Sequence, residues 1–159
     1  MRMMTMLLAG FALFVALPVG FAGDGDELKK LQGAWEIANL IVGGVPVADK
    51  EIAGMKFVFK DKTLTITPPK SDTGVVVPRT FSVTVDGKKQ PATVDLTALD
   101  GELKGNVSPG ILEVKADTLR WCQSDDPKAK VRPAAFASPE KSAIYLFTFK
   151  KAQAAPVKK

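Results

Sequence analysis

The chain contains no histidine and only one cysteine, Cys122. Without histidine, Ser-His-Asp and Cys-His catalysis are excluded, and so are histidine-ligated zinc and haem sites. One cysteine cannot form an intramolecular disulfide, a cysteine-only zinc site or an iron–sulfur cluster. The hydrophobic core must therefore hold the fold unaided, and we expect no metal and no cofactor.

Motifs for phosphate binding and for calcium binding are also missing. No glycine-rich loop of the form Gly-x-x-x-x-Gly-Lys or Gly-x-Gly-x-x-Gly occurs. The acidic pairs at 24–26 and 125–126 lack the series of spaced oxygen ligands that a calcium loop needs. With no recognisable catalytic constellation, the sequence predicts a protein that is not an enzyme.

A charge of one sign accumulates only at the ends of the chain. Arg2 and four lysines among the last ten residues account for the net charge of +5, and residues 23–149 carry equal numbers of basic and acidic side chains. No basic face is predicted, so we expect no nucleic-acid partner. Residues 152–159 are expected to form a short disordered basic tail.

Residues 1–22 have the three parts of a secretory signal peptide. Arg2 supplies a positive start, residues 7–17 form an apolar run, and small residues stand at −3 and −1 of a cleavage site before Gly23. A membrane span needs about 20 apolar residues, whereas this run ends at Pro18. An uncleaved N-terminal anchor is the alternative. We expect export to the periplasm or the extracellular space, without stable membrane insertion after cleavage.

The rest of the chain is a succession of short alternating segments separated by turn residues, and it has no long helical period. Alternation predicts eight strands, at 34–42, 55–60, 63–67, 75–85, 93–97, 110–114, 118–123 and 143–150. A short helix at 27–32 precedes them, and one helical turn is expected within 47–53. Residues 23–151 are thus predicted to form one all-β domain, an eight-stranded antiparallel up-and-down barrel; a two-sheet β-sandwich is the alternative.

The inward-facing side chains predicted by the alternation are mostly aromatic. They are Trp35, Ile37, Phe57, Phe59, Leu64, Ile66, Trp121, Tyr145, Phe147 and Phe149. An aromatic side chain buries on the order of 150–250 Å², so the sequence predicts a largely filled lumen. Any pocket is expected at the mouth, near the loop at 124–141. The last strand is apolar on both faces, and the short helix is expected to cover its outer side.

Two segments of the chain carry a family resemblance. They are 31–35, followed by 44–47, and 110–122, followed by 131–133 and 136–138. In this order they resemble an uncharacterised family of exported domains abundant in planctomycete bacteria, over about residues 28–151. The resemblance implies a lipocalin-like barrel in the cell envelope and no established activity.

Gly33-Ala34-Trp35 also has the Gly-x-Trp form that opens lipocalin barrels. This resemblance implies that Gly33 and Trp35 close the barrel floor, with the tryptophan packed under a basic side chain from the end of the last strand. Lys150 is the residue best placed for that role.

The candidate ligand contacts are Trp121, Arg132, Phe136 and Tyr145, expected at the barrel mouth. Arg132 would meet an anionic head group; the alternative, which we favour, is a loop arginine that binds carbonyl groups or pairs with Asp125 or Asp126. We therefore expect a monomeric, exported, non-enzymatic domain that binds a small apolar or amphipathic ligand. The alternative function is a protein-interaction or structural module of the cell envelope with a filled barrel.

Two further side chains have alternative interpretations. Cys122 is expected to be a small buried residue, the alternative being an exposed thiol beside Arg120. Arg79 follows Pro78 on an apolar strand face. It points either into the barrel end or, after a bulge, outward.

Overall fold

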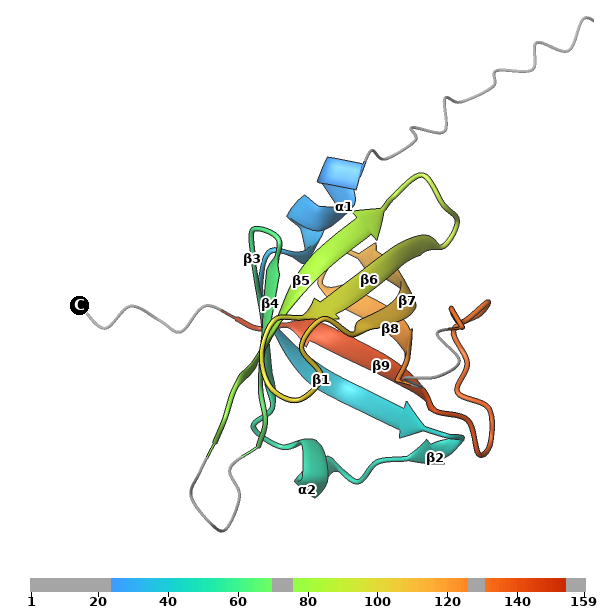
Figure 1. Ribbon diagram of the computed structural model, residues 1–159. Helices are drawn as coiled ribbons and strands as arrows, with labels where there is room; N and C mark the ends of the chain where they lie inside the picture. The colour runs from blue at the N-terminus through green and yellow to red at the C-terminus, as the bar shows by residue number, and fades with distance from the viewer. Residues whose placement is uncertain (1–23, 70–75, 126–130, 154–159) are drawn as a thin grey trace, which may run out of the picture.

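A computed structural model describes residues 24–69, 76–125 and 131–153. These residues form one sheet in the order β2-β1-β3-β4-β5-β6-β7-β8-β9, which closes because β1 also pairs with β9 (Figure 1). The strands are β1 Gly33–Val42, β2 Val45–Pro46, β3 Lys56–Lys60, β4 Thr63–Thr67, β5 Arg79–Asp86, β6 Ala92–Ala98, β7 Val107–Lys115, β8 Thr118–Ser124 and β9 Ile144–Lys151. The predicted closed eight-stranded antiparallel barrel is confirmed. The short strand β2 is additional and pairs with the last two residues of β1.

The predicted strand positions are close to the observed ones except at β5 and β7. β5 begins at Arg79, and residues 76–78 before it are not in a strand. β7 begins at Val107 and continues through Pro109, although proline has no N–H to donate to a neighbouring strand. The predicted helix is α1, Asp24–Leu31, and the predicted helical turn is α2, Asp49–Ile52. β2 was not predicted.

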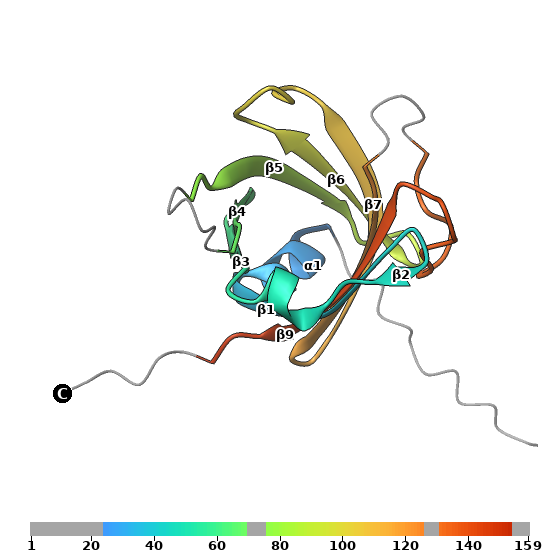
Figure 2. The ribbon, with the colours of Figure 1, turned by 90° about the horizontal axis from the view of Figure 1, so that it is seen from below.

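Helix α1 closes one end of the barrel. Leu31 is fully buried in the main core, and Leu28 packs against that core. Figure 2 looks along the barrel and shows α1 across its far end. The expectation that this helix covers the outer face of the last strand is therefore wrong, because its two apolar side chains fill the barrel floor instead.

The residues around Trp35 confirm one part of the expected floor and correct another. Trp35 is buried and donates its indole N–H to the carbonyl oxygen of Leu31 at 2.7 Å. The basic side chain over its ring is Lys151, whose Nζ lies 5.5 Å from the ring centre. Lys150, the predicted residue, lies opposite Glu36 in the register of β1 and β9, and its side chain is exposed. The predicted residue is one position away from the observed one. Successive side chains of a strand point to opposite faces, so Lys150 points away from Trp35.

The predicted signal peptide, residues 1–22, and residues 154–159 of the predicted tail lie outside the described residues. Among the helices of the described part, none is both long and apolar enough to cross a membrane.

Candidate functional site

A cavity of about 370 Å³ lies inside the barrel, and none of its lining residues belongs to α1. Its deeper walls are apolar and include Phe57, Ile66, Phe81, Leu96, Trp121 and Phe147. Its rim includes the polar side chains of Arg79, Asn106, Ser108, Gln123, Asp125 and Tyr145. The volume lies within the range of about 300–1,000 Å³ typical of ligand sites. The floor is filled as expected, and the cavity opens at the mouth, where any pocket was expected. Its volume is larger than the expectation of a largely filled lumen allowed.

The cavity persists because the aromatic side chains gather on one wall. The rings of Phe57, Phe59, Trp121, Tyr145, Phe147 and Phe149 form one cluster on β3, β8 and β9. Contacting ring centres within it lie 4.9–6.4 Å apart. The opposite wall carries one ring, that of Phe81, and its other lining residues include the small side chains of Ala98 and Ser108. The number of aromatic residues in the strands overestimates how much of the lumen is filled, because rings that pack against one another leave space in front of the facing wall.

Gly110 in β7 lies close to the neighbouring strand β8 and to the Trp121 ring. A Cβ atom at this position would lie 2.7 Å from the carbonyl oxygen of Cys122 and 3.0 Å from Nε1 of Trp121. Only glycine leaves room for the indole at this position. Among the described residues, Nε1 of Trp121 is the one buried side-chain polar atom without a hydrogen-bond partner.

The rim of the cavity brings together groups of opposite charge. Arg79 lines the cavity, so its side chain belongs to the barrel end and is not turned outward by a bulge. Burial raises the pKa of Asp125, and the positive charge of Arg79 opposes that rise. The pKa of Tyr145 is raised by burial and by the charge of Asp125. The charge of Arg79 therefore acts on the ionisation of Asp125, and the charge of Asp125 acts on that of Tyr145.

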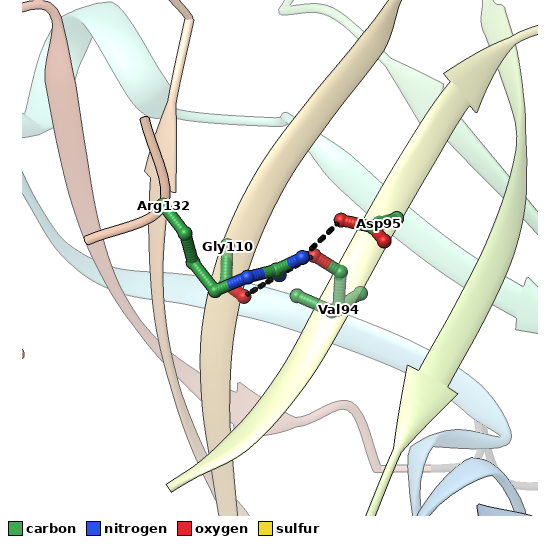
Figure 3. A network of polar contacts seen from close by, with 4 residues as sticks. All are labelled: Val94, Asp95, Gly110 and Arg132. Carbon is green, nitrogen blue, oxygen red and sulfur yellow. Dashed lines mark hydrogen bonds and ion pairs between the residues drawn. The ribbon is translucent and has the colours of Figure 1, made fainter. Parts of the chain in front are cut away.

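Arg132 lies outside this cavity, contrary to its predicted place at the mouth. Its Nη1 donates to the carbonyl oxygens of Val94 and Gly110 at 2.9 and 2.6 Å, and Nη2 pairs with Asp95 at 2.8 Å. Figure 3 shows the guanidinium laid against β6 and β7. The favoured interpretation, a loop arginine that binds carbonyl groups, is confirmed, although its acidic partner is Asp95.

Phe136 is also absent from the lining of the cavity. Its ring lies under the guanidinium of Arg120, with the Arg120 Cζ atom 4.5 Å from the ring centre. Arg120 neighbours inward-facing Trp121 in β8 and therefore points outward. Of the four predicted ligand contacts, Trp121 and Tyr145 line the cavity, whereas Arg132 and Phe136 hold residues 131–143 against the outside of the barrel.

Cys122 belongs to the contact between this outer segment and the barrel. It is fully buried, and its Sγ atom donates to the carbonyl oxygen of Ala137 at 3.3 Å. Burial raises the pKa of the Cys122 thiol. The hydrogen bond to Ala137 and the charge of Arg120 lower it by less, so the pKa is raised overall. The prediction of a small buried residue is confirmed, and the exposed-thiol alternative is wrong.

Sequence reasoning missed several residues of the cavity, among them Phe81, Leu96, Gln123 and Asp125. Phe81 and Leu96 could have been found, because both belong to alternating apolar rows in their strands. Gln123 and Asp125 continue the inward row of Trp121 at the barrel mouth. Because both side chains are polar, the apolar alternation does not identify them as inward-facing.

A second hollow, of about 480 Å³, lies between β1 and α2, where Glu36, Asp49 and Lys56 are among its lining residues. The rest of its lining is mainly apolar and includes Ile37, Ile52 and Met55. Among the described residues, no group of three or more histidine, cysteine or acidic side chains is placed to hold a metal ion.

Comparison with known proteins supports the fold alone. No family model matches the chain, and no curated protein matches it significantly in sequence. The fold is similar to that of a lipocalin-like protein from Bacteroides uniformis, with a TM-score of 0.50, 9% sequence identity, and coverage of 77% of this chain and 99% of that one. An uncharacterised protein from Bacteroides eggerthii is similar over the same shares of the two chains, with a TM-score of 0.45 and 9% identity. The similarity to the Bacteroides uniformis protein shows a lipocalin-like fold.

Proposed function

We propose that this protein is a non-enzymatic binding protein that holds one small amphipathic molecule inside the mouth of its barrel. The observation that carries the proposal is the cavity of about 370 Å³, with apolar walls and a polar rim. An eight-stranded barrel is just wide enough to be filled by side chains or to hold one small ligand. Here the floor is filled and the mouth is not, which favours a ligand that enters from the mouth.

The location proposed for this activity is the cell envelope or the extracellular space. It rests on the signal-peptide pattern of residues 1–22 and on the resemblance to exported planctomycete domains. N-terminal sequencing of the protein purified from its natural host tests it. We expect the mature chain to begin at Gly23, and an intact Met1 on membranes would contradict export.

Binding can be tested with the neutral apolar dye N-phenylnaphthylamine, whose fluorescence rises in apolar surroundings. We expect saturable one-to-one binding to the wild type. Ala98→Phe places a ring in the cavity and should weaken dye binding about tenfold or more, the size of a 1.4 kcal/mol loss. Val58→Phe is the matched control, because Val58 is 39% exposed and does not line the cavity. Thermal melts of both variants check that the barrel remains folded.

The outcome that contradicts the proposal is equal dye binding by the wild type and Ala98→Phe, or no binding by either. Mass spectrometry of small molecules extracted from natively purified protein supplies an independent test. An apolar or amphipathic molecule at a one-to-one ratio supports the proposal. An empty barrel that retains a protein partner would instead favour the alternative function, an interaction module.

A further inference from the structure

The polar groups at the mouth restrict which head group the proposed ligand can carry. Two rim residues carry full charges of opposite sign, Arg79 at the start of β5 and Asp125 directly after β8. Strands β6 and β7 separate β5 from β8 in the sheet. The two charges therefore approach the cavity from different walls, and a head group at the mouth lies between them.

The two charges act across the opening of the cavity. The positive charge of Arg79 lowers the pKa of Asp125 against the effect of burial. No ion pair within 4.0 Å joins these two side chains among the described residues. Both groups thus influence the same opening without direct ion pairing, and each has hydrogen-bonding capacity to offer a ligand.

A head group that carries a single charge would be attracted by one of these side chains and repelled by the other. A carboxylate would pair with Arg79 and oppose Asp125, and an ammonium group would do the reverse. A hydroxyl group is compatible with both, because it accepts a hydrogen bond from the guanidinium and donates its own hydrogen to the carboxylate. Tyr145 and Gln123 at the same rim add donors and acceptors that carry no charge.

We infer that the ligand is an uncharged amphiphile with a hydroxyl head group, held between Arg79 and Asp125 with its apolar tail against Trp121 and Phe57. This inference rests on the proposed function and specifies the chemistry of the same site. The tail is short or compact, since the cavity lies near the lower end of the range for ligand sites.

Three probes with one tail and different heads test the inference. Octanol, octanoate and octylammonium are titrated at neutral pH against bound N-phenylnaphthylamine, and displacement of the dye is measured. We expect octanol to displace the dye from the wild type at the lowest concentration. Asp125→Asn should improve octanoate relative to octanol by roughly tenfold, and Arg79→Gln should improve octylammonium by a similar factor, each the equivalent of about 1.4 kcal/mol.

Asp117→Asn is the matched control for loss of an acidic side chain. Asp117 is exposed in the turn between β7 and β8, at the closed end of the barrel, and does not line the cavity. It should leave the order of the three probes unchanged. Thermal melts and dye affinity show that the rim variants are folded and still bind.

The possible failures are distinguishable. If the dye does not bind to the wild type, the proposed function fails and the inference fails with it. If the dye binds but octanoate or octylammonium displaces it best from the wild type, the function stands and the inference is overturned. The inference is also overturned if neither rim variant alters the relative strength of the three probes.

Discussion

The ammonium group of Lys151 lies 5.5 Å from the centre of the Trp35 ring, at the floor of the barrel. The two residues are directly opposite each other in the β1–β9 pairing. The first and last strands of the barrel therefore meet at a cation–π contact, over a tryptophan that is also hydrogen-bonded to α1.

Removal of the Trp35 ring should destabilise the whole domain. We expect Trp35→Ala to lower the free energy of unfolding by about 3–5 kcal/mol, the range for truncation of a large buried aromatic side chain. Urea denaturation followed by circular dichroism measures this loss. Trp35→Phe keeps most of the ring and should cost less. A urea midpoint for Trp35→Ala close to that of the wild type would contradict the role of Trp35 in closing the floor.

The two neighbouring lysines of β9 should differ in their contribution to stability. Lys151→Gln removes the cation over Trp35 and should cost about 0.5–1 kcal/mol, as expected for an exposed cation–π contact. Lys150→Gln is the matched control and should change the unfolding free energy little, because Lys150 lies on the opposite face of the strand. The same urea denaturation compares them. Equal losses would show that charge alone, and not the contact with Trp35, is responsible.

Most of the barrel could be predicted because strand alternation and turn residues are local signals. Thr63–Thr67 agrees with the prediction at both ends, since the polar and apolar residues alternate without interruption and Asp61-Lys62 precedes them. In β1 the alternation is broken by a bulge between Ile37 and Asn39. The bulge places Ile37 opposite Phe149 and Leu40 opposite Phe147, so both face inward although they are an odd number of positions apart.

The place of the cavity at the mouth was predicted, but its size could not be predicted from the same local signals. Its volume depends on the direction in which rings lean once the barrel has closed, and alternation gives only the face of the sheet. Arg132 illustrates a related limit. Its three partners, Val94, Gly110 and Asp95, lie far from it in the sequence. No pattern around Arg132 identifies them, whereas a loop arginine near a predicted barrel mouth suggests a ligand contact.

Arg132 should prove important for stability and unimportant for ligand binding. We expect Arg132→Ala to cost about 1–3 kcal/mol, because it removes charge-assisted hydrogen bonds that are partly exposed to solvent. Arg132→Lys should recover little, since an ammonium group cannot reproduce the fork of a guanidinium. Dye affinity should be unchanged in both. Unchanged stability combined with weaker dye binding would return Arg132 to its predicted place at the mouth.

Gly110 should tolerate no larger residue. The added methyl of Gly110→Ala would lie 2.7 Å from a backbone oxygen of β8, which cannot move independently of the sheet. We expect a loss of about 1–3 kcal/mol, the usual cost of overpacking. Gly105→Ala in the turn before β7 is an informative comparison. It has open space for a Cβ but a φ of +85°, so its cost would come from backbone strain alone. Gly110→Ala should in addition change the fluorescence of Trp121, and Gly105→Ala should not.

The ionisation of Asp125 should reduce stability at neutral pH. Because the pKa of Asp125 is raised in the folded protein, the protonated form is favoured by folding. The stability that this provides is fully present below the pKa of the unfolded chain, about 3.9 for an aspartate. It is lost as the pH rises through the higher pKa of the folded state. We therefore expect Asp125→Asn to raise the melting temperature slightly at neutral pH, and the gain over the wild type to disappear in acid.

Arg79→Gln tests the other half of this relationship. It removes the positive charge that opposes the effect of burial, so the pKa of Asp125 should rise further. Carbon-detected NMR titration of the Asp125 carboxyl measures that change directly. Arg120→Gln, on the outer face of β8, is the control and should leave the titration of Asp125 as it is in the wild type. An Asp125 pKa that is the same with and without Arg79 would mean that the two charges do not share the mouth of the barrel, and a charged head group would then meet only one of them.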